Sequence, residues 1–87
     1  MAKLLEKPEE LEELKVTANI EGTPLTITRN GKPERVTRIY QQWQVSEQFF
    51  DQEILKNYFR VRTSKGVICD IYRDAASNSW YLGCVYD

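Results

Sequence analysis

Three side chains that could contact nucleic acid alternate along one stretch near the C-terminal end of the chain. Tyr58, Arg60 and Arg62 are two residues apart, so in a β-strand they point to the same face. Arginine can bind phosphate oxygens in pairs, and a tyrosine ring can stack on an unpaired base. Lys56 and Lys65 flank the stretch, and no acidic residue lies between them. The pattern predicts a basic and aromatic β face.

The next run of β-forming residues could extend this face. It ends with Tyr72 and Arg73, and pairing of the two runs would bring them beside the first group. The candidate nucleic-acid-binding residues are therefore Arg60, Arg62, Arg73, Lys65, Lys56, Tyr58 and Tyr72. The other interpretation is a solvated sheet face. In that case the arginines pair with Glu53, Asp70 or Asp74, and their aliphatic stems cover Tyr58.

The chain lacks the residue types on which most catalytic and metal sites depend. It has no histidine, the usual acid–base group near neutral pH. Neither Cys69 nor Cys84 has an identifiable base near it in the sequence, and two cysteines cannot supply the four ligands of a structural zinc. Asp70 and Asp74 are close in sequence, but the fold indicated offers no evident cleft. We therefore expect a non-enzymatic protein that uses no cofactor and no metal.

Charge and hydropathy limit the partners. Residues 1–14 have a net charge of −3 and the other 73 residues a net charge of +2, while the pI is near 5.5. This balance argues against a protein that coats nucleic acid indiscriminately, but it allows a local basic site. No run of 18 apolar residues or secretory signal is present, so we expect no membrane association and a reducing cytoplasm. The two cysteines are expected to be free there, although a Cys69–Cys84 disulfide stays possible.

Alternating apolar and polar residues predict strands over most of the chain. The expected strands cover residues 15–20, 25–28, about 34–45, 58–63, 67–73 and 79–86. Asn30-Gly31 predicts a type I′ hairpin turn, and Pro33 places the start of the next strand at an edge or outside the pairing. Val36 and Ile39 have opposite parity, which indicates either two partly covered faces or a bulge between them.

Residues 46–56 are open to two interpretations. Ser46 could cap a helix that carries Phe49, Phe50 and Ile54, or the segment could be a hairpin that turns at Asp51-Gln52-Glu53. We favour the turn because of the family resemblance described below.

The expected architecture is mainly all-β, a single antiparallel meander of five or six strands that curls into a partly open barrel over residues 15–87. Apolar residues on both parities of 79–86 indicate a strand covered on both sides. Trp43, Trp80 and both cysteines are expected in the core. The N-terminal extension, residues 1–14, is expected to contain a short helix over 8–14 that begins with Pro8 and docks its leucines on the sheet.

Several motifs occur in the order found in one family. They are Pro24, Asn30-Gly31, Trp43, Phe49-Phe50-Asp51, Tyr58-Phe59-Arg60-Val61, Tyr72-Arg73-Asp74, Trp80-Tyr81-Leu82 and Val85-Tyr86-Asp87. With them, residues 24–87 resemble a family of small bacterial domains of unknown function. Members occur alone or at the C-terminal end of proteins related to the mutagenesis-cassette relatives of Y-family DNA polymerases. The chain departs from the family's pattern at Arg29 and at Phe49-Phe50, where aromatics and paired tryptophans are common.

The resemblance implies an antiparallel fold with a turn at Asp51-Gln52-Glu53, and it associates the chain with DNA-damage tolerance. Together these observations predict a binding module that contacts nucleic acid or a DNA-handling assembly through the basic and aromatic face. The alternative is a protein–protein adaptor that uses an exposed edge strand or the acidic, leucine-rich N-terminal helix.

Overall fold

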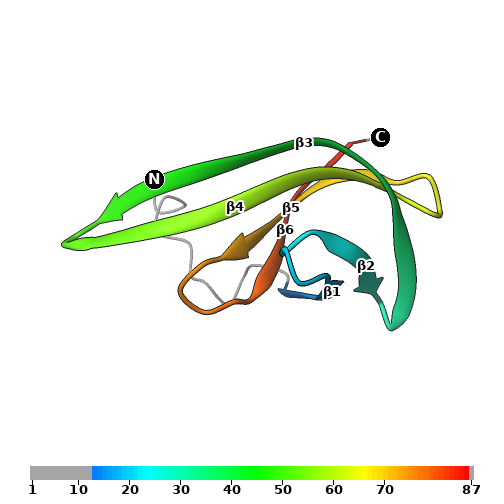
Figure 1. Ribbon diagram of the computed structural model, residues 1–87, viewed down its shortest axis with the longest axis horizontal. Helices are drawn as coiled ribbons and strands as arrows, with labels where there is room; N and C mark the ends of the chain where they lie inside the picture. Colours follow the sequence, from blue (N-terminus) through cyan, green and yellow to red (C-terminus); the bar gives the residue numbers. More distant parts are fainter. Residues whose placement is uncertain (1–12, 87) are drawn as a thin grey trace, which may run out of the picture.

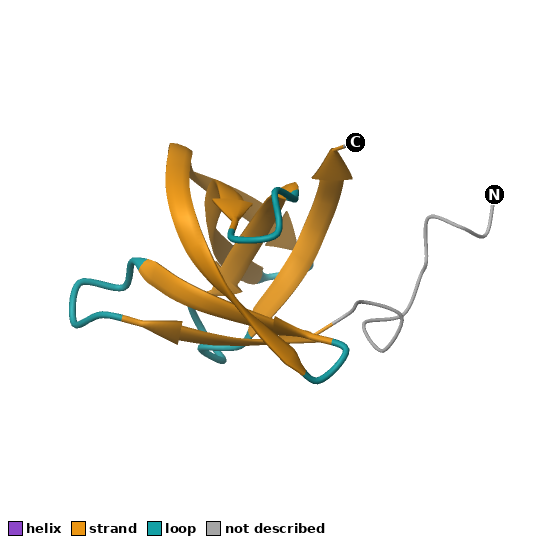
Figure 2. Cartoon of the chain, turned by 90° about the vertical axis from the view of Figure 1, so that its right-hand side faces the viewer, coloured by secondary structure: helices purple, strands orange, loops and turns teal. Residues whose placement is uncertain are grey.

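The computed structural model describes residues 13–86, apart from the side chain of Phe49, and consists of six strands (Figure 1). These are β1 (Glu13–Ala18), β2 (Pro24–Arg29), β3 (Lys32–Phe49), β4 (Gln52–Thr63), β5 (Ile68–Asp74) and β6 (Trp80–Tyr86). Each strand pairs antiparallel with the next, and β6 pairs with β1. Figure 2 shows the strands and their connecting turns from a second direction. The predicted all-β meander is confirmed, and the barrel is closed rather than partly open.

The predicted N-terminal helix is not part of this barrel. Residues 1–12 lie outside the described residues, so most of that prediction falls there. Its last two residues, Glu13 and Leu14, pair with Tyr81 and Trp80 as the start of β1, and for them the prediction is wrong. The reason is burial, because Leu14 is an inward residue of a strand and is only 5% exposed. No helix in the described part of the chain is long and apolar enough to cross a membrane.

Two β-bulges in β3 decide which of its side chains face the interior. The register shifts lie between Val36 and Arg38 and between Ile39 and Gln41. Of the two alternatives that the sequence left open, the first shift shows the bulge, which lets both Val36 and Ile39 pack against the core. The second turns Trp43 outward, although Trp43 has the parity of Ile39 in the sequence. The prediction that Trp43 belongs to the core is therefore wrong.

The core is small and is built from all strands except β3, whose apolar residues border it. Its buried members are Leu14, Ile27, Phe59, Val61, Cys69, Ile71 and Trp80. The rings of Phe59 and Trp80 lie 5.7 Å apart inside the barrel. Both cysteines are free, as predicted, but only Cys69 is buried, and Cys84 is exposed.

The turn between β2 and β3 has the conformation that its residues favour. Asn30 and Gly31 both have positive φ, 52° and 78°, which confirms the predicted type I′ geometry between β2 and β3. Pro33 pairs with Thr28 of β2, whereas pairing of β3 with β4 begins only at Val36, so Pro33 lies at an open edge on that side.

The β3–β4 hairpin continues well beyond the barrel. β5 pairs with β4 only from Lys56 to Arg62, so residues 46–54 form a two-stranded arm, seen at the left of Figure 1. The arm turns at Phe50-Asp51. The predicted hairpin is confirmed, one residue earlier than expected, and the helix alternative for residues 46–56 is wrong.

Candidate nucleic-acid interface

Four aromatic rings form a row across the outer face of β3, β4, β5 and β6. Trp43, Tyr58, Tyr72 and Tyr81 occupy paired positions on these consecutive strands. Their ring centroids are 5.2, 4.9 and 5.4 Å apart in that order, and the Trp43 and Tyr58 planes differ by only 9°. We call these four residues the aromatic row. It is a cross-strand ladder outside the core, of the kind that stabilises an antiparallel sheet.

The middle of the aromatic row is not available for stacking on a ligand. Tyr72 is 5% exposed because Tyr58 and Tyr81 cover it on its two sides. The Lys56 ammonium lies 5.1 Å from its ring centroid. Burial of Tyr72 raises the pKa of its hydroxyl above the ordinary value. Tyr72 therefore supports the row, whereas Trp43 at the β3 end and Tyr81 at the β6 end each have a ring neighbour on one side only among the described residues.

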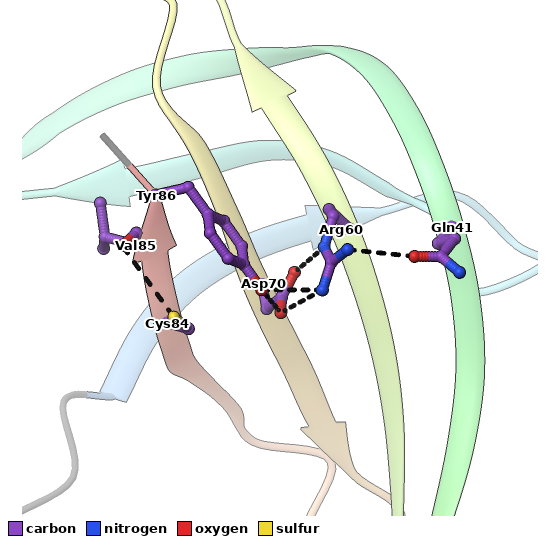
Figure 3. Close-up of polar contacts among 6 residues, drawn as sticks. All are labelled: Gln41, Arg60, Asp70, Cys84, Val85 and Tyr86. Carbon is purple, nitrogen blue, oxygen red and sulfur yellow. Dashed lines mark hydrogen bonds and ion pairs between the residues drawn. The ribbon is translucent and has the colours of Figure 1, made fainter.

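A polar network next to the aromatic row holds Arg60 in place (Figure 3). Asp70 accepts hydrogen bonds from Arg60 Nε at 2.8 Å and Arg60 Nη2 at 3.2 Å, and from the Tyr86 hydroxyl at 2.6 Å. Arg60 also donates to Gln41 Oε1 at 3.2 Å and to the Tyr86 hydroxyl at 2.7 Å. Its guanidinium lies 5.5 Å from the Trp43 ring centroid. Arg60 therefore pairs with Asp70, as the solvated-face interpretation predicted for the arginines.

The network sets the protonation of its members. Burial by itself would raise the pKa of Asp70, but the hydrogen bonds from Arg60 and Tyr86 outweigh it and hold that pKa below its ordinary value. The hydrogen bond with Asp70 raises the pKa of Arg60, and the same carboxylate raises the pKa of the Tyr86 hydroxyl. Near neutral pH the network is therefore an ion pair with a phenol that donates to it.

Gly83 allows β6 to join this network. The register between β5 and β6 shifts here, because Ile71 pairs with Leu82 while Asp70 pairs with Cys84. A Cβ atom at Gly83 would lie 3.3 Å from the Asp70 carbonyl oxygen, which is tighter than ordinary contact, and 3.4 Å from Tyr58 Cε2, at the limit of ordinary contact. A larger residue here would force these neighbours to shift by a few tenths of an ångström, and the bulge brings the side chain of Tyr86 over Asp70.

Four cations gather at one end of the same outer face and have no ion-pair partner among residues 13–86. Arg38 of β3 and Arg62 of β4 are directly paired, exposed and outward. Arg35 lies next along β3, where its amide and carbonyl are bonded to Ser64 at 3.1 and 2.7 Å. Lys65 lies in the adjoining β4–β5 turn. We call Arg35, Arg38, Arg62 and Lys65 the basic end.

An exposed aromatic ring lies against the basic end. Tyr40 occupies the second β3 bulge, is 41% exposed and has the Arg38 guanidinium 5.2 Å from its ring centroid. The sequence reasoning missed Arg35, Arg38 and Tyr40. For the two arginines a signal was present, because a bulge between Val36 and Ile39 places residues 35 and 38 on one face. For Tyr40 there was none.

The predicted site residues divide into three groups. The structure brings together Lys56, Tyr58, Arg60, Arg62 and Tyr72 on the outer face. Lys65 lies in the turn at the basic end. Arg73 does not join them, because it follows Tyr72 in the strand and so points to the opposite side, where it donates a hydrogen bond to Asn78 Oδ1.

Lys56 is also engaged. Its ammonium lies 3.2 Å from Glu47 Oε1 on β3. Burial would lower the pKa of Lys56, but the hydrogen bond to Glu47 more than offsets this, and the pKa is raised. Of the seven predicted residues, the cations without an anionic partner in the described part of the chain are Arg62, Lys65 and Arg73, and Arg73 points away from the outer face.

No three His, Cys, Asp or Glu side chains among residues 13–86 are grouped so as to hold a metal ion. Comparisons with protein-family models, with curated proteins and with solved structures gave no match for this chain. A function therefore has to be argued from the geometry of the outer face.

Proposed function

We propose that this protein is a non-enzymatic binding module that contacts single-stranded nucleic acid through the outer face of β3 and β4. The basic end holds the phosphates, and Tyr40 and Trp43 offer ring surface to unpaired bases. Arg60 and the rest of the aromatic row act as the support that fixes the position of Trp43.

The observation that carries this proposal is the pairing of Arg38 with Arg62. Like charges directly opposite each other on one sheet face are destabilising, and neither arginine has an acidic partner among the described residues. On the same face Arg60 has a nearly ideal partner in Asp70. Two neighbouring strands lie about 4.8 Å apart, so both guanidinium groups can bind one phosphate or two adjacent ones.

The aromatic side chains favour single strands over a duplex. A ring can stack only on a base that is not already stacked and paired in a helix. Tyr40 lies beside Arg38 of the basic end, and Trp43, three residues further along β3, lies beside Arg60, so a strand that crosses the basic end would meet phosphate contacts and ring faces together. The resemblance to domains attached to Y-family-polymerase-like proteins is consistent with a role in DNA handling, and this stays a prediction.

The test is a fluorescence-anisotropy titration of the full chain with labelled single-stranded DNA, single-stranded RNA and duplex DNA of one sequence. We expect single strands to bind more tightly than the duplex, and the affinity to fall as salt is raised. Tyr40→Ala should weaken binding by about 1–3 kcal/mol, the usual contribution of one stacked base. Arg73→Gln is the matched control and should bind as the wild type does. No binding to single strands even at low salt would disprove the proposal.

A further inference from the structure

Gln41 lies on the outer face between the basic end and the aromatic row. On β3 it follows Arg38 and precedes Trp43, and it pairs with Arg60 of β4, whose side chain is on the same face. Gln41 is exposed. A nucleic-acid strand that runs from the basic end to Trp43 therefore passes over the Gln41 amide, which holds no phosphate and offers no ring.

The amide of Gln41 has a defined orientation. Arg60 Nη1 donates a hydrogen bond to Gln41 Oε1 at 3.2 Å. A guanidinium has donors only, so the oxygen of the amide and not its nitrogen must face Arg60. Figure 3 shows the oxygen directed at Arg60 and the nitrogen directed away from it. Arg60 is itself held by Asp70 and Tyr86, which keeps this hydrogen-bond partner in place.

The free nitrogen of Gln41 lies on the side where a base can stack on Trp43. Tyr58 of β4 stacks on Trp43 at an interplanar angle of 9°, so it covers the side of the ring that faces β4. A base therefore stacks on the side that faces away from β4. Gln41 Nε2 also points away from β4 and has no hydrogen-bond partner among residues 13–86. Residues 41 and 43 are about 6.6 Å apart along the strand, so the edge of the stacked base comes within reach of the amide.

This orientation changes which base a glutamine favours. A glutamine that is free to turn recognises adenine with both amide atoms, because it accepts from the amino group and donates to a ring nitrogen. Here Arg60 holds the acceptor oxygen away, and the side that faces the ligand has two N–H donors. Thymine and uracil present carbonyl oxygens that accept from these donors, whereas the amino group of adenine would place donor against donor.

We propose that Gln41 reads the base stacked on Trp43 and makes the site prefer thymine or uracil to adenine. The inference rests on the proposed function and adds a base preference to it. Arg60 is the positioning residue, because it sets the orientation of the amide and leaves the contact with the base to Gln41.

Anisotropy titrations of the full chain with labelled oligo(dT) and oligo(dA) of one length, at one salt concentration, measure this preference. We expect the wild type to bind oligo(dT) at least about fivefold more tightly, as for one hydrogen bond. Base stacking and backbone flexibility alone give some single-strand sites a preference for pyrimidines. The decisive quantity is therefore the change in the ratio of the two affinities when Gln41 is replaced.

Two variants change the amide in different ways. Gln41→Ala removes the donors and should lower the ratio about fivefold. Gln41→Glu should lower it further, because a carboxylate accepts from the amino group of adenine and repels the carbonyl oxygens of thymine. The added negative charge weakens the binding of both strands, and the ratio cancels that effect. Gln42→Glu is the matched control, because Gln42 is exposed and points to the opposite side of β3, and it should leave the ratio unchanged.

The outcomes separate this inference from the proposed function. If both strands bind but Gln41→Ala and Gln41→Glu keep the wild-type ratio, the inference is wrong and the proposed function stands. A wild type that binds oligo(dA) as tightly as oligo(dT) overturns the inference in the same way. A wild type that binds neither strand at low salt overturns both.

Discussion

Replacement of Asp70 is the substitution whose effect follows most directly from the structure. The carboxylate is 6% exposed and accepts three hydrogen bonds, two from Arg60 and one from Tyr86. Asp70→Asn keeps the shape of the side chain but removes its charge and replaces one acceptor by an amide donor that faces other donors. Loss of such a partner at a buried site costs about 1–3 kcal/mol.

Solvent access to Arg60 limits the loss of stability expected for Asp70→Asn. The Arg60 side chain is 34% exposed, so water can replace part of what Asp70 provides. We therefore expect Asp70→Asn to lower the free energy of unfolding by about 1–2 kcal/mol, which for a domain of this length is roughly 5–15 °C in Tm. Urea and thermal unfolding near neutral pH measure both. Asp51→Asn, at an exposed carboxylate, is the control and should change stability by less than about 0.5 kcal/mol. Equal stabilities of wild type and Asp70→Asn would refute the reasoning.

The pH dependence of the free energy of unfolding is a second test of the network around Asp70. The pKa of Asp70 in the folded protein lies below its ordinary value of 3.8, because the hydrogen bonds from Arg60 and Tyr86 outweigh the effect of burial. The unfolded chain therefore takes up this proton first. The stabilisation is complete above about pH 4 and is lost as the pH falls through the folded pKa. The stability gap to Asp70→Asn should thus be constant near neutral pH and shrink in acid, and a gap that widens in acid would contradict the account.

Two further predictions concern buried groups. The Glu34 carboxylate is 7% exposed and its Oε1 has no hydrogen-bond partner among residues 13–86, so Glu34→Gln should raise the free energy of unfolding by about 1 kcal/mol in urea unfolding. A loss of similar size would show that this charge is paired. Burial raises the pKa of the Cys69 thiol, whereas Cys84 is exposed. A thiol reagent at about pH 8 should therefore react quickly with one thiol of the native protein, and Cys84→Ser should abolish that fast phase. Two fast thiols would show that the barrel opens near Cys69.

Much of the fold could be predicted because its signals are local. Alternation marks the strands, and Asn30-Gly31 requires a tight hairpin wherever it occurs. The wrong predictions concern residues whose position in the fold depends on contacts with residues distant in the sequence. Leu14 lies in an acidic, leucine-containing segment that suits a helix, and only its burial against Trp80 makes it a strand residue. Trp43 was misplaced because a bulge at Tyr40 depends on how Ile39 packs inside the barrel.

The site was predictable only in outline. Alternation along β4 correctly placed Tyr58, Arg60 and Arg62 on one face. The inclusion of both Tyr72 and Arg73 was inconsistent with the same rule, since adjacent strand residues point to opposite sides. The partners of Arg60 depend on strand register, which the sequence does not reveal. The adaptor alternative, so far as it rests on the N-terminal helix, falls outside the described residues and stays a prediction.

The salt dependence of nucleic-acid binding tests the central claim most directly. Each phosphate that a cation neutralises on a single strand contributes about 0.7 to the slope of log Kobs against log salt concentration. If Arg38 and Arg62 each hold one phosphate, the double variant Arg38→Gln/Arg62→Gln should bind with a slope smaller by about 1.4, while Arg73→Gln keeps the wild-type slope. A double variant with the wild-type slope would show that the paired arginines are not the phosphate contacts.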